Sequence, residues 1–171
     1  RKQLRKHRGS RRAADAHAQH KDKHRVQHQV GRCADHHAEH TGCGIALRID
    51  ERAGRLFIEK GNEDRYAASG WEVRSEQQFE AALAQLTANG VAFTRSTPAE
   101  RALRHVTDMV WFRDPSGNRH ELSYGFVTSF AKFCSPTGTG FVTGDLGYGH
   151  MVLPAPNIAE TRAFLMQNLG L

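Results

Sequence analysis

Residues 106–124 read VTDMVWFRDPSGNRHELSY and predict a β-hairpin. Apolar side chains alternate with others along residues 106–112, which is typical of a strand with one buried face. The candidates for that face are Val106, Phe112 and either Met109 or Val110. Residues 114–118, DPSGN, combine the residue types that favour a tight turn, and residues 120–124 suit the returning strand.

The residues before this hairpin complete a β-α-β-β-β unit over residues 70–124, in which we expect an antiparallel sheet. A short strand is expected at residues 71–73. Ser75 then begins a helix, and Gln78 three residues later completes a capping-box pattern. Three apolar side chains recur at helical spacing: Phe79, Leu83 and Leu86. An Asn-Gly pair ends the helix, and a strand over residues 91–94 follows.

Ahead of this unit, a second pair of short strands is expected. Residues 45–49 and 55–59 are β-compatible, and the polar residues 50–54 between them suit a hairpin turn. We assign residues 43–69 to a partial first module and residues 43–125 as a whole to one structural domain.

The first 42 residues differ in composition from everything that follows. Residues 1–40 hold eleven Arg and Lys, four acids and eight of the eleven histidines, a net charge of +7, whereas the whole chain carries +6. So few large apolar side chains cannot offset the entropy of ordering, and we expect a basic, His-rich segment that is disordered or aberrant, for example through a shifted reading frame. Two alternatives remain: nucleic-acid binding through the basic run, and a metal held by His36 and His40.

Other features of the composition restrict the class of protein. No run of eighteen apolar residues is present, so we expect no membrane span. The three cysteines are Cys33, Cys43 and Cys134, and no two of them form a CxxC pair. This usage argues against a disulfide framework and suits a reducing cytoplasm, where we expect the protein to reside.

The final part of the chain contains a histidine in a distinctive setting. Residues 140–153 read GFVTGDLGYGHMVL, and His150 follows two glycines at the expected start of a buried strand. Asn157 and Glu160 form a second capping-box pattern, and three side chains share one face of the helix that follows: Ile158, Leu165 and Leu169. We therefore expect a new β-α-β-β-β repeat to begin near Leu146 and to be cut off after its first strand and helix.

Several of these motifs resemble the type I extradiol ring-cleavage dioxygenases, the family of biphenyl-2,3-diol 1,2-dioxygenase in the vicinal oxygen chelate superfamily. Residues 47–50 with Arg55-Leu56 look like the early hairpin of that family, and GWEV and GVAF look like two strands of its next module. FRDPSGN followed by Glu121-Leu122 resembles its DPxGN hairpin. The stretch FVTGD-x-G-x-GH, residues 141–150, resembles the segment that carries its first iron ligand.

The resemblance implies an α+β fold of β-α-β-β-β modules, with the first module incomplete and the last one truncated. Residues 126–140 would be a linker, and residues 141–171 the start of a catalytic domain that holds Fe(II) with two histidines and one glutamate. By resemblance, His150 is the first metal ligand and Val152 is a wall residue of the substrate pocket. The implied activity is extradiol cleavage of a 2,3-dihydroxybiphenyl-like diol by O₂ in the full-length form. The other ligands and the family's acid/base residues have no counterpart in these 171 residues, so we expect an inactive fragment with no catalytic residue of its own.

The resemblance also implies a homo-oligomer for the full-length form, an expectation that weakens for a fragment. Two other functions remain open: a non-catalytic vicinal oxygen chelate module that binds a small ligand, and a basic-tailed protein associated with nucleic acid, which we do not favour.

Five further residues are interpreted as structural. Glu121 holds a strand position that supplies a carboxylate ligand in other modules of the superfamily, yet is not catalytic in this family. His105 and His120 are expected in turns or at the surface, whereas Trp71 and Trp111 are expected to pack.

Overall fold

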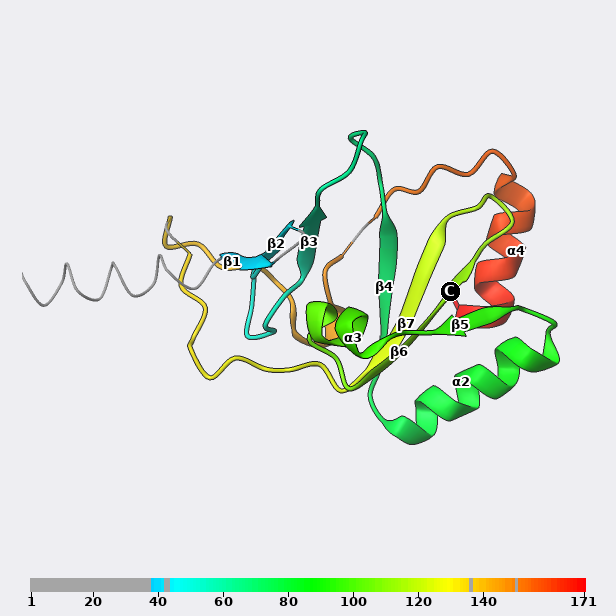
Figure 1. Cartoon of the computed structure of the whole chain (residues 1–171), viewed down its shortest axis with the longest axis horizontal. Helices are drawn as coiled ribbons and strands as arrows, with labels where there is room; N and C mark the ends of the chain where they lie inside the picture. The colour runs from blue at the N-terminus through cyan, green and yellow to red at the C-terminus, as the bar shows by residue number, and fades with distance from the viewer. Residues whose placement is uncertain (1–37, 42–43, 136, 150) are drawn as a thin grey trace, which may run out of the picture.

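The computed structural model describes residues 38–41, 44–135, 137–149 and 151–171. These residues form a four-stranded sheet with helices packed on it and a smaller three-stranded sheet beside it (Figure 1). The chain has the mixed α+β architecture that we expected. No helix in the described ranges is long and apolar enough to cross a membrane.

The larger sheet contains the predicted β-α-β-β-β unit. Its strands are β4 (Ala68–Val73), β5 (Phe93–Arg95), β6 (Asp108–Arg113) and β7 (Arg119–Tyr124), in the spatial order β4-β7-β6-β5. The expected hairpin is confirmed, because β6 and β7 pair antiparallel across the DPSGN turn. The expectation of a wholly antiparallel sheet is wrong: β4 pairs parallel with β7, because the helical connection brings the first strand beside the last in the same direction.

Helix α2 (Glu76–Ala88) covers one face of this sheet and supplies much of the core. Ser75 caps it as predicted, accepting a hydrogen bond from the backbone N–H of Gln78. The buried core cluster combines three residues of α2 with three residues of β6 and β7: Phe79, Leu83, Leu86, Val110, Phe112 and Leu122. A short helix, α3 (Pro98–Arg104), lies between β5 and β6 and has a complete capping box at Thr97 and Glu100.

The smaller sheet contains β1 (Ala38–Thr41), β2 (Gly44–Leu47) and β3 (Leu56–Glu59). The predicted hairpin of β2 and β3 is confirmed, with Leu47 opposite Leu56. Strand β1 corrects our assignment of residues 38–41 to a disordered segment. It pairs antiparallel along the whole of β2, so the ladder hydrogen bonds order a polar sequence that buries little apolar surface. The rest of the basic segment, including His36, lies outside the described residues.

Residues 126–135 lie across the turn between β2 and β3. The backbone N–H of Ala53 donates to the carbonyl oxygen of Val127 at 3.0 Å, and that of Ser129 donates to Glu51 at 2.7 Å. The buried guanidinium of Arg48 donates to the carbonyl oxygen of Ala131 at 2.8 Å. The first part of the expected linker is therefore attached to the smaller sheet.

The C-terminal segment differs from expectation in its strand and in the packing of its helix. Residues 151–155 form no strand, because no described strand lies beside them to accept ladder hydrogen bonds. Between β7 and helix α4 (Ile158–Leu169), the described residues form one short element, the 3₁₀ turn η1 (Gly144–Leu146). The helix packs on the larger sheet beside α2, with the Phe164 ring 6.0 Å from that of Phe112 (Figure 1).

The predicted apolar face of α4 is also only partly correct. Leu169 packs against the core, whereas Ile158 is exposed. Asn157 occupies the N-cap position as expected, yet its side chain makes no capping bond and donates to the carbonyl oxygen of Pro115 at 3.2 Å. Helix α4 is thus oriented by polar contacts that its own sequence pattern does not reveal.

Candidate functional site

The two residues predicted to belong to a catalytic site lie in the segment that leads into α4. His150 lies outside the described residues, so its role as a metal ligand stays a prediction. Val152 is 91% exposed and has no regular secondary structure. Its role in a substrate pocket likewise stays a prediction.

An open apolar cleft of about 410 Å³ lies between this segment and α4. Its apolar lining residues come from the segment and from α4 with the residue that ends the sequence: Met151, Leu153, Ala155, Ile158, Leu165, Met166 and Leu171. Val152 does not line it. The cleft offers contact area to an apolar group, but Thr161 and Arg162 are its only polar side chains among the described residues, too few to fix the orientation of a diol.

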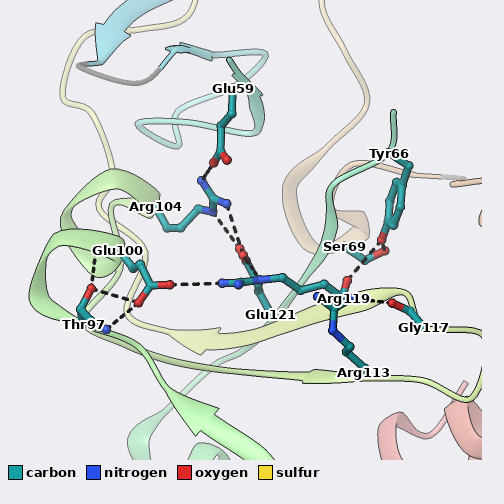
Figure 2. Close-up of polar contacts among 10 residues, drawn as sticks. All are labelled: Glu59, Tyr66, Ser69, Thr97, Glu100, Arg104, Arg113, Gly117, Arg119 and Glu121. Atoms are coloured by element: carbon teal, nitrogen blue, oxygen red, sulfur yellow. Dashed lines mark hydrogen bonds and ion pairs between the residues drawn. The ribbon is translucent and has the colours of Figure 1, made fainter. Parts of the chain in front are cut away.

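A second, smaller cavity of about 180 Å³ lies on the opposite face of the sheet from α2 and contains Glu121. Figure 2 shows Glu121 between two arginines. Arg104 donates to both carboxylate oxygens, at 2.7 and 3.2 Å, and Arg119 donates to one of them at 2.9 Å. Glu59 also accepts from Arg104, at 2.5 Å, and Glu100 accepts from Arg119, at 3.4 Å.

These contacts explain the electrostatics of the cluster. Burial by itself would lower the pKa of the Arg104 guanidinium, but the hydrogen bonds and charges of Glu121 and Glu59 outweigh it and raise that pKa. The guanidiniums of Arg104 and Arg119 occupy the directions from which a cation would approach the Glu121 carboxylate. The structural interpretation of Glu121 is therefore supported.

His120 lies on the other face of the same strand, and its expected position in a turn or at the surface is wrong. Its side chain is fully buried, 5.7 Å from the ring of Phe112. The indole N–H of Trp71 donates to Nδ1 at 3.0 Å, so Nε2 carries the proton and donates to Asp114 Oδ2 at 3.1 Å. Both ring nitrogens are thus occupied, and His120 has no free atom for a metal.

Strand alternation could have located His120. It stands two residues before the core residue Leu122, so both side chains point to the same face of β7. Glu121 between them points to the opposite face. The missed signal is therefore the period of two, which we applied to β6 but not to β7.

Asp114 organises the predicted turn between β6 and β7. Its Oδ1 accepts from the backbone N–H groups of Ser116 and Asn118, each at 2.9 Å, and Oδ2 accepts from the Asn118 amide at 2.9 Å. Burial would raise the pKa of the Asp114 carboxyl, but the bonds from Asn118 and His120 lower it below its usual value. The turn is held by an ionised carboxylate.

The remaining candidates have structural positions. His105 ends α3 in a left-handed conformation with a φ of 54°, so its expected place in a turn is confirmed. Trp71 packs against the core, and the Arg119 guanidinium lies 4.5 Å above the ring of Trp111, so both tryptophans make packing contacts as expected.

The described residues do not fit an iron site by themselves. Within the described ranges, no three His, Cys, Asp or Glu side chains lie close enough together to hold a metal ion. Glu121 and His120 are residue types that can bind iron, but both are bonded to protein side chains. Glu121 accepts from Arg104 and Arg119, and His120 is bonded to Trp71 and Asp114. A metal bound by this chain would therefore need ligands outside the described residues, and His150 remains the predicted one.

Comparisons with known proteins agree with this architecture. A family described as the Glyoxalase/Bleomycin resistance protein/Dioxygenase superfamily matches residues 9–122, a range that begins inside the basic segment. The chain is 36% identical over 126 residues to an iron-dependent extradiol dioxygenase of Rhodococcus jostii, covering 74% of this chain and 42% of that protein. It is 41% identical over 126 residues to the 3-methylcatechol 2,3-dioxygenase of Pseudomonas putida, covering 72% and 43%.

Solved structures give the same result. A halotolerant catechol dioxygenase superimposes with a TM-score of 0.69 at 34% identity, covering 74% of this chain and 43% of that one. A catechol 2,3-dioxygenase superimposes with a TM-score of 0.69 at 27% identity, covering 74% and 44%. The chain therefore spans less than half the length of these relatives. The chain contains a β-α-β-β-β unit, and the family match covers two thirds of its length, residues 9–122. The chain therefore belongs to the glyoxalase/bleomycin resistance protein/dioxygenase superfamily.

Proposed function

We propose that this chain is part of an extradiol dioxygenase that cleaves a catechol-type aromatic diol with Fe(II) and O₂. The observation that supports this most strongly is the 36 and 41% identity to two extradiol dioxygenases over about three quarters of the chain. A biphenyl-2,3-diol 1,2-dioxygenase of a Pseudomonas strain is also 36% identical over 132 residues. The relatives share the catechol unit and differ in its substituents, so the proposal is limited to catechol-type diols.

In this proposal, the described residues up to 125 build a structural domain, residues 141–171 begin the catalytic domain, and His150 contributes one ligand to iron. Iron bound by two histidines and one carboxylate supplies open positions for a diol and O₂. Neither Glu121 nor His120 is available to that iron: Glu121 is paired with Arg104 and Arg119, and His120 is bonded to Asp114. Val152 would line the substrate pocket only in the presence of a complete catalytic domain.

A chimera tests this assignment. Residues 44–171 would replace the matching segment of the Pseudomonas putida 3-methylcatechol 2,3-dioxygenase, to which the chain is 41% identical. We expect the chimera to convert 3-methylcatechol to a yellow ring-cleavage product, and the same chimera with His150→Ala to lose that activity.

The matched control is His105→Ala in the same chimera. His105 ends α3, on the described module rather than in the segment leading into α4, and its substitution should leave turnover within a factor of about two. A folded chimera without turnover, or one whose turnover survives His150→Ala, would contradict the proposal.

A further inference from the structure

Two buried polar side chains at one end of the larger sheet contact residues 151–154. Ser69, in β4, is 1% exposed, and its hydroxyl lies 3.1 Å from the sulfur of Met151. The amide of Asn118, just before β7, donates to the carbonyl oxygen of Pro154 at 2.7 Å. Because β4 and β7 are parallel, with Ser69 opposite His120, both contacts come from the same end of the sheet.

Both of these side chains are themselves held in place. Figure 2 shows the Ser69 hydroxyl paired with that of Tyr66, which also donates to the carbonyl oxygen of Arg119 at 3.4 Å. The Asn118 amide donates at the same time to Asp114 Oδ2. Ser69 and Asn118 are thus each bonded to the module as well as to the segment.

The DPSGN turn also holds the beginning of α4. The hydroxyl of Ser116 lies 2.7 Å from that of Thr161, which is 4% exposed, and accepts from the backbone N–H of Asn157 at 3.3 Å. The side chain of Asn157 donates to the carbonyl oxygen of Pro115. A turn in the structural module therefore binds the helix that follows the proposed ligand.

The far end of α4 is attached to α2. Asn89 donates to Asn168 Oδ1 at 2.9 Å, and Gln85 donates to the carbonyl oxygen of Gln167 at 2.5 Å. Between the two ends, Phe164 packs on Phe112. The helix is thus held at both ends. Because residues 151–154 lead directly into it, the position of α4 also restricts where they lie.

Val152 lies between the two contact points and projects away from them. Met151 and Pro154 touch the module, whereas Val152 is exposed to solvent. Residue 150 is adjacent to Met151 in sequence and is four residues from Pro154, a separation that an extended chain spans in at most about 14 Å.

We propose that Ser69 and Asn118 are positioning residues that hold residues 151–154 on the structural module, and that Ser116 in the DPSGN turn holds the start of α4. They thereby fix where His150 and Val152 enter the catalytic domain. The statement about His150 rests on the proposed function; the attachment itself does not. The structural domain would then act on the metal site by setting the position of the segment that follows one ligand.

Hydrogen exchange of the full 171-residue chain, measured by mass spectrometry without metal, tests the attachment. We expect Ser116→Ala and Asn118→Ala to speed exchange in peptides covering residues 151–161 by about fivefold for each hydrogen bond lost. Exchange in α2 should stay unchanged. Ser116→Thr, which keeps the hydroxyl, should restore the wild-type rate.

Two results would overturn the proposal. One is unchanged exchange at residues 151–161 in both alanine variants. The other is an equal increase in α2, which would mean a general loss of stability. Asn118→Ala also removes a bond to Asp114, so the Ser116 pair provides an independent result if that variant fails to fold. Because no metal or substrate is present, failure here would leave the chimera test of the proposed function unaffected.

Discussion

Replacing Arg104 by methionine is expected to lower the free energy of unfolding by about 3 kcal/mol. Arg104 makes two charge-assisted hydrogen bonds to the buried carboxylate of Glu121 and one to Glu59. Hydrogen bonds to charged groups contribute about 1.5–3 kcal/mol each, and removing one partner of a buried ion pair costs about 3–5 kcal/mol. Because Arg119 remains 2.9 Å from Glu121, the lower end of that range applies.

A second substitution tests whether the cost comes from the unpaired charge. In the double variant Arg104→Met/Glu121→Gln, the buried group is neutral and can still accept from Arg119, so about 1–2 kcal/mol should be recovered relative to Arg104→Met alone. Urea unfolding followed by circular dichroism gives both free energies. Arg95→Met is the matched control, because Arg95 makes exposed ion pairs with Glu80 and Asp108 and its loss should cost less than about 1 kcal/mol. A change below about 0.5 kcal/mol for Arg104→Met, or strictly additive effects in the double variant, would refute the argument.

Three further predictions concern stability, pH and metal. Truncation of the fully buried Phe79 to alanine should cost about 3–5 kcal/mol in urea unfolding, whereas Ser75→Ala, which removes the α2 cap, should cost about 1 kcal/mol; equal effects would contradict the assigned core. The lowered pKa of Asp114 stabilises the fold above the unfolded value near 3.8, and this contribution is lost as pH falls through the folded pKa. The free energy of unfolding, measured from pH 6 to pH 2, should therefore fall less steeply in Asp114→Asn than in the wild type. An equally steep fall in both would show that the carboxylate is not involved. The purified chain alone should hold no stoichiometric iron by elemental analysis and should not turn 2,3-dihydroxybiphenyl yellow in air; turnover that depends on His150 would show that the chain is catalytic by itself.

Local patterns predicted the secondary structure of the central module well. The turn at residues 114–118 and the alternation before it located β6 and β7, and Ser75 marked the start of α2. These signals act over a few residues and depend on backbone geometry that a sequence encodes directly.

Features that depend on distant partners could not be read in the same way. The parallel pairing of β4 with β7 joins residues about fifty positions apart, and β1 is ordered by β2 rather than by its own side chains. The apolar run at residues 151–153 predicted a strand, but a strand needs a neighbour to accept its hydrogen bonds.

The candidate site shows the same division. The motif around His150 predicted a metal ligand by resemblance, and the cluster around Glu121 needed three-dimensional contacts before its role was clear. Arg104 and Arg119 come from α3 and β7, and no sequence spacing indicates that both guanidiniums meet one carboxylate. The attachment of α4 through Ser116, and of residues 151–154 through Asn118, was equally hidden, because each side chain contacts a residue about forty positions away.

The iron content of the chimera tests the central claim most directly. Elemental analysis of the purified chimera, reconstituted with Fe(II) without oxygen, should give about one iron per chain, as expected for a site of two histidines and one carboxylate. His150→Ala should reduce that content severalfold while α2 and the larger sheet stay folded by circular dichroism. Full iron occupancy in the His150→Ala chimera would contradict the claim that this chain supplies a ligand to the catalytic metal.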